Sequence, residues 1–285
     1  MNKQRLPADY IRDPSLLQPA WARQWAPPAW LFDFSQRAEL MEHHGGRLMS
    51  FSHRADNNCF YPENSLEAVI SCLLMGVDIV ELDVRMTKDK ILVLSHDNTV
   101  IRCTNAAQLR SERPEDFPQS DLFSQWTIEQ IRQLRLLDGN GAVTPYGVAE
   151  FSHVLQICAG RMFMILDKLE ETAAEDGKTE EQWRQAYLEP LMQQFDSTPS
   201  CVKGWHFAME NNWILGDYRE GYPTQWTELI NGPAKGKNLE AGTLPSAFDD
   251  LVHWQELEAL GVDYIMTNHP LELVRYIAEK YCPKA

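Results

Sequence analysis

The chain alternates short apolar runs with stretches in which apolar residues recur at helical spacing. Four runs lack polar alternation and end in histidine or charged residues: RLMSFSH (47–53), VDIVELDVR (77–85), KILVLSHD (90–97) and RMFMILDK (161–168). Such runs are typical of strands buried on both faces, as in a parallel sheet covered by helices. Between the first two, PENSLEAVISCLLMG (62–76) predicts a helix that Asn64 or Ser65 caps and Gly76 ends.

Further elements follow along the chain. Helices are predicted at 127–137, 146–160 and 180–195, a short strand at 199–207, and a helix, strand, loop and helix within 251–281. Residues 211–244 show no clean period. About seven or eight strand–helix units favour a (β/α)8 TIM barrel of the α/β class. An open doubly wound sheet is the alternative, but the sequence has no glycine-rich nucleotide loop to support it.

The first 45 residues differ in composition from the rest. Prolines alternate there with tryptophans, at Pro7, Pro14, Pro19, Pro27, Pro28, Trp21, Trp25 and Trp30. Prolines interrupt regular elements, whereas tryptophans are seldom left in water. We therefore predict an irregular N-terminal arm over 1–45 that packs on a barrel domain formed by 46–285.

Charge and cysteine content exclude several classes of protein. Acidic side chains outnumber basic ones by 41 to 26, a formal net charge of −15, so no nucleic-acid partner is expected. A bound cation can still reverse the local sign for a small anionic substrate. No apolar stretch approaches the length of about 20 residues that a membrane helix needs, no secretory signal is found, and the six cysteines contain no CxxC pair. We expect buried free thiols and a cytoplasmic protein without an integral membrane segment; the oligomeric state is not indicated.

The predicted strands end in residues that carry chemistry. Their ends hold His53 with Arg54, Glu81 with Asp83, His96 with Asp97, and Asp167 with Lys168. The carboxyl ends of barrel strands meet on one face, so these side chains are expected to converge. Glu81 and Asp83 point the same way on a strand and repel unless a cation lies between them. Oxygen ligands favour Mg²⁺ or Ca²⁺; the alternative is ion pairing with Arg85 or Arg102.

Two of the eight histidines, His53 and His96, close apolar strands. Imidazole titrates near neutrality, so this pair suits a general base and a general acid. With a metal ion and a nearby arginine, the set fits a phosphodiester better than a carbonyl substrate. Acyl transfer by a serine nucleophile is disfavoured because no GxSxG occurs. The other histidines are expected to be structural.

Residues 52–105 resemble the signature half of the glycerophosphodiester phosphodiesterase family. The family pattern is an HR pair, a PEN(S/T) segment, an ExDV strand ending in TKD, and an HD pair before R-x-T. The matching residues are His53-Arg54, Pro62-Glu63-Asn64-Ser65, Glu81-Leu82-Asp83-Val84, Thr87-Lys88-Asp89, and His96-Asp97 with Arg102 and Thr104. Weaker likeness continues to GVDYIMTNHP (261–270), which is similar to the last strand and loop of the family.

This resemblance implies a (β/α)8 barrel with an insertion after the third strand, matching the polar stretch 98–127. It also implies that His53 and His96 are the acid–base pair and that Arg54 contacts the phosphate. Glu63, Glu81 and Asp83 would lie at one divalent cation, Mg²⁺ or Ca²⁺. The implied reaction hydrolyses a glycerophosphodiester, a small phosphodiester substrate, to glycerol 3-phosphate and an alcohol.

The sequence departs from the family pattern at three places. Ala55 replaces the glycine of HRG, and Asn268 replaces the aspartate of a TD pair, a change to which we attach no role. The usual ExK or DxK is absent, because Asp167 directly precedes Lys168. Neighbouring strand residues point oppositely, so only a bulge or the end of the strand can aim both inward. We assign Asp167 as a further metal ligand, and Lys168 and Lys203 as rival phosphate lysines.

Two other functions stay open. Relatives such as sphingomyelinase D and the agrocinopine synthases resemble this family but transfer to a hydroxyl group or form a cyclic phosphate, on a lysophospholipid or sugar phosphodiester. The tryptophan-rich arm and the loops of 211–244 would then supply a sugar-binding wall. A non-catalytic barrel is disfavoured, because all motif residues of the first three strands are present.

Overall fold

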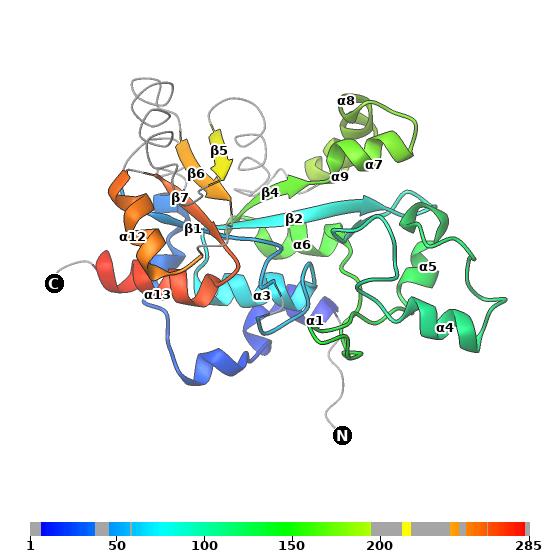
Figure 1. The fold of residues 1–285 in the computed structure, drawn as a ribbon, viewed down its shortest axis with the longest axis horizontal. Helices are drawn as coiled ribbons and strands as arrows, with labels where there is room; N and C mark the ends of the chain where they lie inside the picture. The colour runs from blue at the N-terminus through cyan, green and yellow to red at the C-terminus, as the bar shows by residue number, and fades with distance from the viewer. Residues whose placement is uncertain are drawn as a thin grey trace.

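The computed structural model describes residues 7–37, 46–57, 59–194, 213–217, 240–244, 249–260 and 262–282, and the account below concerns these residues. The chain begins with helix α1 (Pro7–Arg12) and three short 3-10 helices at Pro14–Leu16, Ala20–Arg23 and Ala29–Phe32. It then enters a sheet whose strands lie at the centre of the molecule (Figure 1).

Six strands of this sheet are parallel: β1 (Met49–Ser52), β2 (Ile79–Met86), β4 (Phe163–Asp167), β5 (Trp213–Asp217), β6 (Glu240–Leu244) and β7 (Tyr264–Thr267). They pair in the order β4-β2-β1-β7-β6-β5, so strands far apart in the sequence are neighbours. Within the described residues β4 and β5 are not paired with each other. The strand predicted at 199–207 lies outside these residues.

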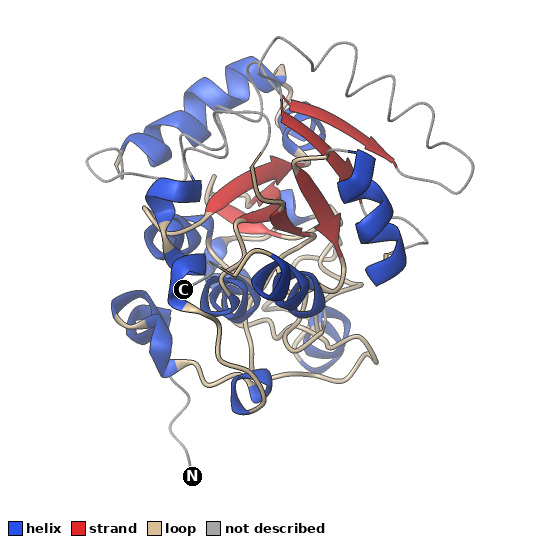
Figure 2. Ribbon diagram, turned by 90° about the vertical axis from the view of Figure 1, so that its left-hand side faces the viewer, coloured by secondary structure: helices blue, strands red, loops and turns tan. Residues whose placement is uncertain are grey.

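Helices surround this arc of strands (Figure 2). They are α3 (Leu66–Met75), α6 (Phe151–Cys158), α7 (Leu169–Glu175), α8 (Glu180–Trp183), α9 (Glu189–Gln193), α12 (Leu251–Leu260) and α13 (Pro270–Lys280), with a π-helical turn at Arg184–Leu188. In α3, Ser65 accepts a hydrogen bond from the Ala68 N–H, and Gly76 ends the helix at φ 85°. The start and end predicted for this helix are therefore confirmed.

The insertion between β3 (Leu92–Leu94) and β4 has its own hydrophobic core. It contains α4 (Ala106–Glu112), a 3-10 helix (Phe123–Gln125) and α5 (Ile128–Ile131). Its cluster includes Phe117, Phe123, Trp126, Ile131 and Leu134. The helix predicted at 127–137 is only one turn long, because Leu136 and Leu137 form β-bridges with Thr104 and Val143.

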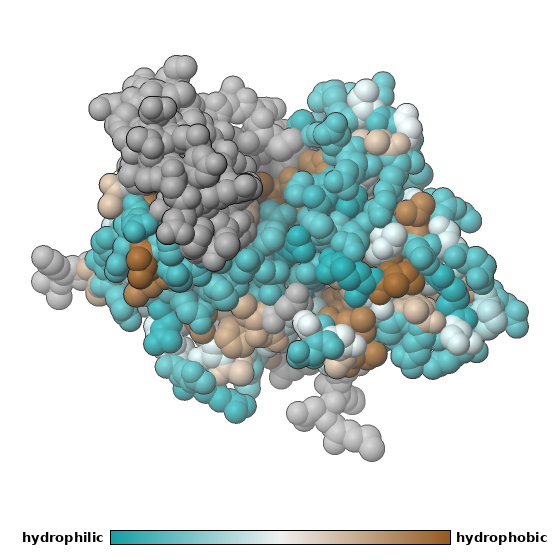
Figure 3. All heavy atoms as spheres, in the orientation of Figure 1, coloured by the Kyte–Doolittle hydropathy of each residue, from teal (hydrophilic) through white to brown (hydrophobic). Residues whose placement is uncertain are grey.

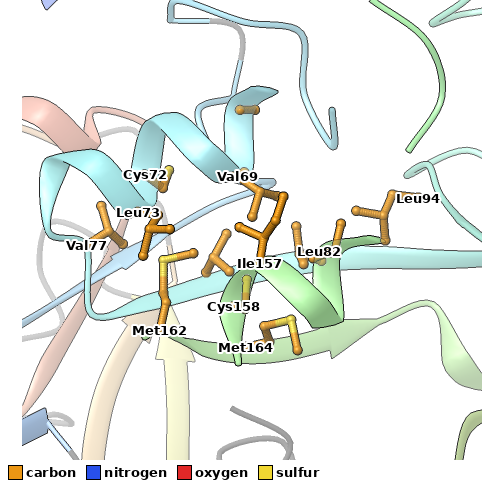
Figure 4. Close-up of a cluster of buried hydrophobic side chains, with 14 of the residues drawn as sticks. Val69, Cys72, Leu73, Val77, Leu82, Leu94, Ile157, Cys158, Met162 and Met164 are labelled. Carbon is orange, nitrogen blue, oxygen red and sulfur yellow. The ribbon is translucent and has the colours of Figure 1, made fainter. Parts of the chain in front are cut away.

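Two core layers follow from the alternation of side chains along the strands. An inner cluster is formed by Met49, Phe51, Ile79, Phe163, Ile165, Tyr264 and Met266. The outer cluster fills the space between strands and helices, with Leu82 and Met164 packed against Val69, Leu73 and Ile157 of α3 and α6 (Figure 4). His53, Glu81, Asp167 and Asn268 each lie two residues after the last inner-cluster residue of their segment. Because alternate residues of a strand face the same side, these four positions also face the centre, toward the carboxyl ends of the strands.

The N-terminal arm covers the opposite, amino ends of the strands. The Phe34 ring stacks on Phe163, the first residue of β4, with centroids 4.9 Å apart. Trp21 is buried and its Nε1 donates to Ser71 Oγ of α3 at 3.1 Å. Leu31 packs so closely on Gly76 that a Cβ there would lie 2.9 Å from the Leu31 Cβ. The arm thus packs on the sheet and on α3; the division of the chain at residue 45 stays a prediction.

An ion-pair cluster closes the same end. Asp78, directly before β2, is fully buried and accepts from Arg37 Nε at 3.0 Å, from Arg47 Nη2 at 2.6 Å and from the Ser50 N–H at 2.9 Å. Burial alone raises the pKa of Asp78, but the Arg47 and Arg37 guanidiniums hold it below its ordinary value. This carboxylate is therefore fully compensated.

Cysteine and helix features bear on two further expectations. The described cysteines are all free, and Cys72 and Cys158 are buried, but the buried-thiol prediction is wrong for the exposed Cys59 and Cys282. Among the described residues, none of the helices combines the length and apolar character that crossing a membrane requires.

Candidate active site

Three carboxylates meet at the carboxyl ends of β2 and β4. The register pairs Asp83 directly with Asp167, and Glu81 lies two residues before Asp83 on the same face. One oxygen from each of the three residues lies within 4.8 Å of the others. Glu81 and Asp83 are buried, whereas Asp167 is at the exposed edge of the group. The convergence predicted for these three residues is present in the structure.

The group carries more negative charge than its surroundings neutralise. Burial and the neighbouring Asp83 raise the pKa of Glu81 well above its ordinary value. Burial also raises the pKa of Asp83, against the opposing effects of the Asn64 hydrogen bond and of His96. The pKa of Asp167 is lowered despite its burial, because Lys168 donates to it. The three carboxylates together form a group that could hold a metal ion.

The end of β4 explains how Asp167 and Lys168 both reach this group. Lys168 follows the strand in the left-handed conformation, at φ 66°, so the chain turns there. Its Nζ lies 3.1 Å from Asp167 Oδ2, while Leu166 points into the outer core. Of the two arrangements that the sequence allowed, a bulge or the end of a strand, the structure has the end of a strand.

His53 directly follows β1 and lies beside the end of β7. Its N–H donates to the Thr267 carbonyl at 3.1 Å, and its Nδ1 lies 2.8 Å from Asn268 Oδ1. Burial lowers the pKa of His53; the hydrogen bond to Asn268 offsets this in part, and the charge of Arg54 adds to it. His53 is therefore held as a neutral ring near pH 7.

His96 reaches the site by a different route from the one predicted. The segment 90–97 was expected to be a parallel strand, but β3 is antiparallel to β2, with Val84 opposite Leu94. The prediction is wrong because β2 continues past the residues that pair with β1 and β4, and the chain turns back in a hairpin along this extension. This return places the Ser95 N–H 3.0 Å from the Asp83 carbonyl, and His96 follows immediately. His96 Nδ1 lies 2.9 Å from Asp97 Oδ1.

Arg54 connects the first loop to the carboxylates. Its backbone N–H donates to Glu81 Oε2 at 2.8 Å, and its Nε lies 3.6 Å from Asp83 Oδ2. Arg54 and Ala55 both have positive φ, 50° and 61°. This backbone conformation favours glycine, which is the residue of the family pattern at the position of Ala55.

Glu63 lies beside the carboxylate group without joining it. Its Oε1 accepts from Arg102 Nη2 at 2.6 Å, and its Oε2 lies 3.4 Å from Arg54 Nη1. Arg102 also pairs with Asp97, while Arg85 pairs with Glu171. Both arginines thus pair with carboxylates other than Glu81 and Asp83. The alternative that Arg85 or Arg102 forms an ion pair with Glu81 and Asp83 is therefore wrong. The assignment of Glu63 as a metal ligand stays a prediction, and Lys203 lies outside the described residues.

Two asparagines at the site were missed as functional residues. Asn64, at φ 58°, holds Asp83 at two points: its Nδ2 donates to Asp83 Oδ2 at 2.7 Å, and its Oδ1 accepts from the Asp83 N–H at 3.1 Å. Asn268 contacts His53, as described above. The sequence held a signal for each: Asn64 belongs to the Pro62-Glu63-Asn64-Ser65 motif, and Asn268 stands where the family pattern has the aspartate of a TD pair.

The strand order defines a TIM-barrel-like α/β protein. Its group of three carboxylates lies toward the carboxyl ends of the strands, where the active sites of this fold are found. Residues 53–199 match the model of the glycerophosphoryl diester phosphodiesterase family. The protein belongs to this family of phosphoric diester hydrolases.

Individual relatives agree with this membership. The Bacillus subtilis protein YhdW, a candidate glycerophosphodiester phosphodiesterase, is 39% identical over 247 residues, which are 74% of this chain and 90% of that protein. The glycerophosphodiester phosphodiesterase of Caldanaerobacter subterraneus subsp. tengcongensis is 42% identical over 88 residues, 31% of this chain and 30% of the relative. The crystal structure of a glycerophosphoryl diester phosphodiesterase from Parabacteroides distasonis shares the fold, with a TM-score of 0.57 and 19% identity over 87% of this chain and 93% of that one.

Proposed function

We propose that the protein is a metal-dependent phosphodiesterase that hydrolyses a glycerophosphodiester to glycerol 3-phosphate and an alcohol. In this proposal residues 46–285 form the catalytic barrel and residues 1–45 the arm that packs on it. The observation that carries the proposal is the grouping of Glu81, Asp83 and Asp167 near two histidines, His53 directly after β1 and His96 after β3. The family of the chain supports the substrate class.

The three carboxylates fit one divalent cation. Their oxygens lie close enough to share an ion, and hard oxygen ligands suit Mg²⁺ or Ca²⁺. The raised pKa values of Glu81 and Asp83 describe the protein without the ion, whose charge would favour their ionised forms. When bound, the cation supplies positive charge to the non-bridging oxygens of the phosphodiester. Glu63 would complete the set from the adjoining loop.

The remaining chemistry falls to side chains of the chain itself. Of His53 and His96, one accepts the proton of the attacking oxygen and the other donates a proton to the leaving alcohol. In this proposal Arg54 and Lys168 bind the phosphate oxygens, with Lys203 as the rival lysine. The attacking group is water or a neighbouring hydroxyl of the substrate, which would form a cyclic phosphate first.

Phosphorus NMR of the reaction tests the proposal. Glycerophosphocholine and glycerophosphoethanolamine are incubated with the full-length protein and Mg²⁺ or Ca²⁺, with and without a chelator. We expect glycerol 3-phosphate to accumulate only with metal. Asp83→Asn, His53→Ala and His96→Ala should each reduce kcat by at least about 10²-fold, while Asp116→Asn, an exposed carboxylate, serves as the matched control. Full activity of both histidine variants would contradict the assignment.

Transfer to a sugar hydroxyl has less support than hydrolysis. The sugar-binding wall was expected from the tryptophan-rich arm and from residues 211–244. Trp21 and Phe34 pack at α3 and at the amino end of β4, which is the end of the strands away from the carboxylates. Addition of a sugar acceptor to the same NMR assay decides between the two reactions, since only transfer yields a new phosphodiester signal.

A further inference from the structure

The two histidines of the site have unlike partners. His96 Nδ1 contacts a carboxylate, Asp97, which is itself paired with Arg102 at 2.6 Å. His53 Nδ1 contacts a neutral amide, Asn268 Oδ1, at 2.8 Å. A ring nitrogen that faces a fixed acceptor must carry the proton, so the partner of Nδ1 decides the tautomer. The nature of that partner also decides whether a charged ring is favoured.

The amide of Asn268 is oriented as an acceptor. Asn57 Nδ2 donates to the same Oδ1 at 2.5 Å, so this atom receives two hydrogen bonds. An amide oxygen has no proton to donate, so it can contact His53 only by accepting the Nδ1 proton. The Nε2 of His53 is then unprotonated and carries its lone pair.

The backbone of Asn268 is fixed by a third residue. Asp249, which precedes α12, accepts from the Asn268 N–H at 2.6 Å, from Thr267 Oγ1 at 2.7 Å and from Trp254 Nε1 at 2.9 Å. Because Asp249 holds the end of β7 at these points, the amide of Asn268 is carried on a well-anchored segment. The contact to His53 joins residues 215 positions apart in the sequence.

We propose that Asn268 is a positioning residue that fixes the proton of His53 on Nδ1, so that Nε2 of His53 is free to accept a proton in the reaction. Since the proposed function needs one acceptor and one donor, the donor role then falls to His96. This proposal rests on the proposed function for the roles in catalysis, but its structural part concerns only the tautomer of His53. The neutral amide orients the ring without adding a negative charge to it.

The charged groups around His53 determine how it should respond to a change at position 268. The charge of Arg54 disfavours the protonated ring, whereas Asp83 and Glu63 favour it, and burial opposes it most. Asp249, from the segment before α12, contacts the backbone of Asn268. A carboxylate at position 268 would add a negative charge directly at Nδ1 and stabilise the protonated ring.

Nitrogen-15 NMR of the metal-loaded, full-length protein with labelled histidine tests the tautomer, with His53→Gln to assign the signal. We expect the proton on Nδ1 in the native protein and a mixture of tautomers in Asn268→Ala. A proton on Nε2 in the native protein, or an unchanged tautomer in Asn268→Ala, would overturn the proposal whatever the activity. If the tautomer behaves as expected but no phosphodiester is cleaved, the proposed function fails and the positioning role stands.

The pH profile of kcat/KM separates this role from a merely structural one. Asn268→Asp should move the acidic limb upward by about one pH unit and keep activity above it, because a base is active only when neutral. Asn268→Ala should lose about 10²-fold in kcat with little change in KM. Asn140→Asp makes the same charge change on an exposed turn and should leave the profile unchanged. An unmoved acidic limb in Asn268→Asp would show that His53 is not the base.

Discussion

The two ends of β2 bury carboxylates in opposite ways. At the amino end, Asp78 has two guanidiniums and a backbone N–H as partners, and its pKa is lowered. At the carboxyl end, Glu81 and Asp83 are buried beside each other and beside Asp167, and their pKa values are raised. A buried charge with partners is tolerated, and removing one partner destabilises the fold, whereas a buried charge without partners reduces stability unless something binds it. The contrast therefore separates a structural carboxylate from candidate ligands on one strand.

The largest effect is expected from breaking the compensated end. Asp78→Asn leaves Arg37 and Arg47 buried beside a neutral amide, and we expect it to lower the free energy of unfolding by about 3–5 kcal/mol. Urea denaturation measures this. Asp116→Asn, at an exposed ion pair, should change the free energy by less than about 0.5 kcal/mol. A loss at Asp78 as small as that of the control would show that the cluster is not structural.

The next effect concerns the uncompensated end. Mg²⁺ or Ca²⁺ at about 100 times its Kd should raise the free energy of unfolding by about 2.7 kcal/mol, because the ion binds the folded chain alone. Thermal unfolding with metal and with chelator measures the shift. Asp83→Asn should abolish it and Asp78 variants that still fold should retain it. A full shift in Asp83→Asn would exclude this group as the site.

A pH effect of about 1–2 kcal/mol should distinguish the two ends in the metal-free protein. A carboxyl whose pKa is raised on folding binds more protons in the folded state, so Glu81 makes stability fall as pH rises above about 4.5. Asp78, whose pKa is lowered, adds stability above pH 3.8 that is lost as the pH falls below that value. Glu81→Gln should therefore flatten the decline between pH 5 and 7. Chemical denaturation across this range measures the slope, and an unchanged slope would contradict the assignment.

The smallest effect tests the neutral contacts of the arm. Trp21→Phe keeps most of the buried ring but removes the hydrogen bond to Ser71, and we expect a loss of about 1 kcal/mol. The activity should not change, because this contact lies at the amino ends of the strands. A loss of kcat in a variant of native stability would instead connect the arm to the site.

Strand periodicity was sufficient to predict part of the site. Glu81, Asp83 and Asp167 come together because alternate residues of neighbouring parallel strands face the same side. The end of β4 at Asp167 was among the alternatives that the sequence allowed. These features depend on local rules, and local rules are readable from the sequence.

Other features depend on contacts that no local pattern encodes. The antiparallel direction of β3 follows from the extra length of β2, since an apolar run looks the same in either direction. The roles of Asn64 and Asn268 depend on backbone turns and on pairing with strands distant in sequence. The helix predicted at 127–137 was shortened because Leu136 and Leu137 bond to other segments of the insertion.

The insertion that follows β3 maintains its own apolar interior, and this separation has an evolutionary consequence. Phe117, Phe123 and Trp126 pack with one another rather than with the inner cluster of the sheet (Figure 3 shows the insertion at the right of the molecule). We therefore expect this segment to tolerate changes in length better than the strands that carry the acidic group.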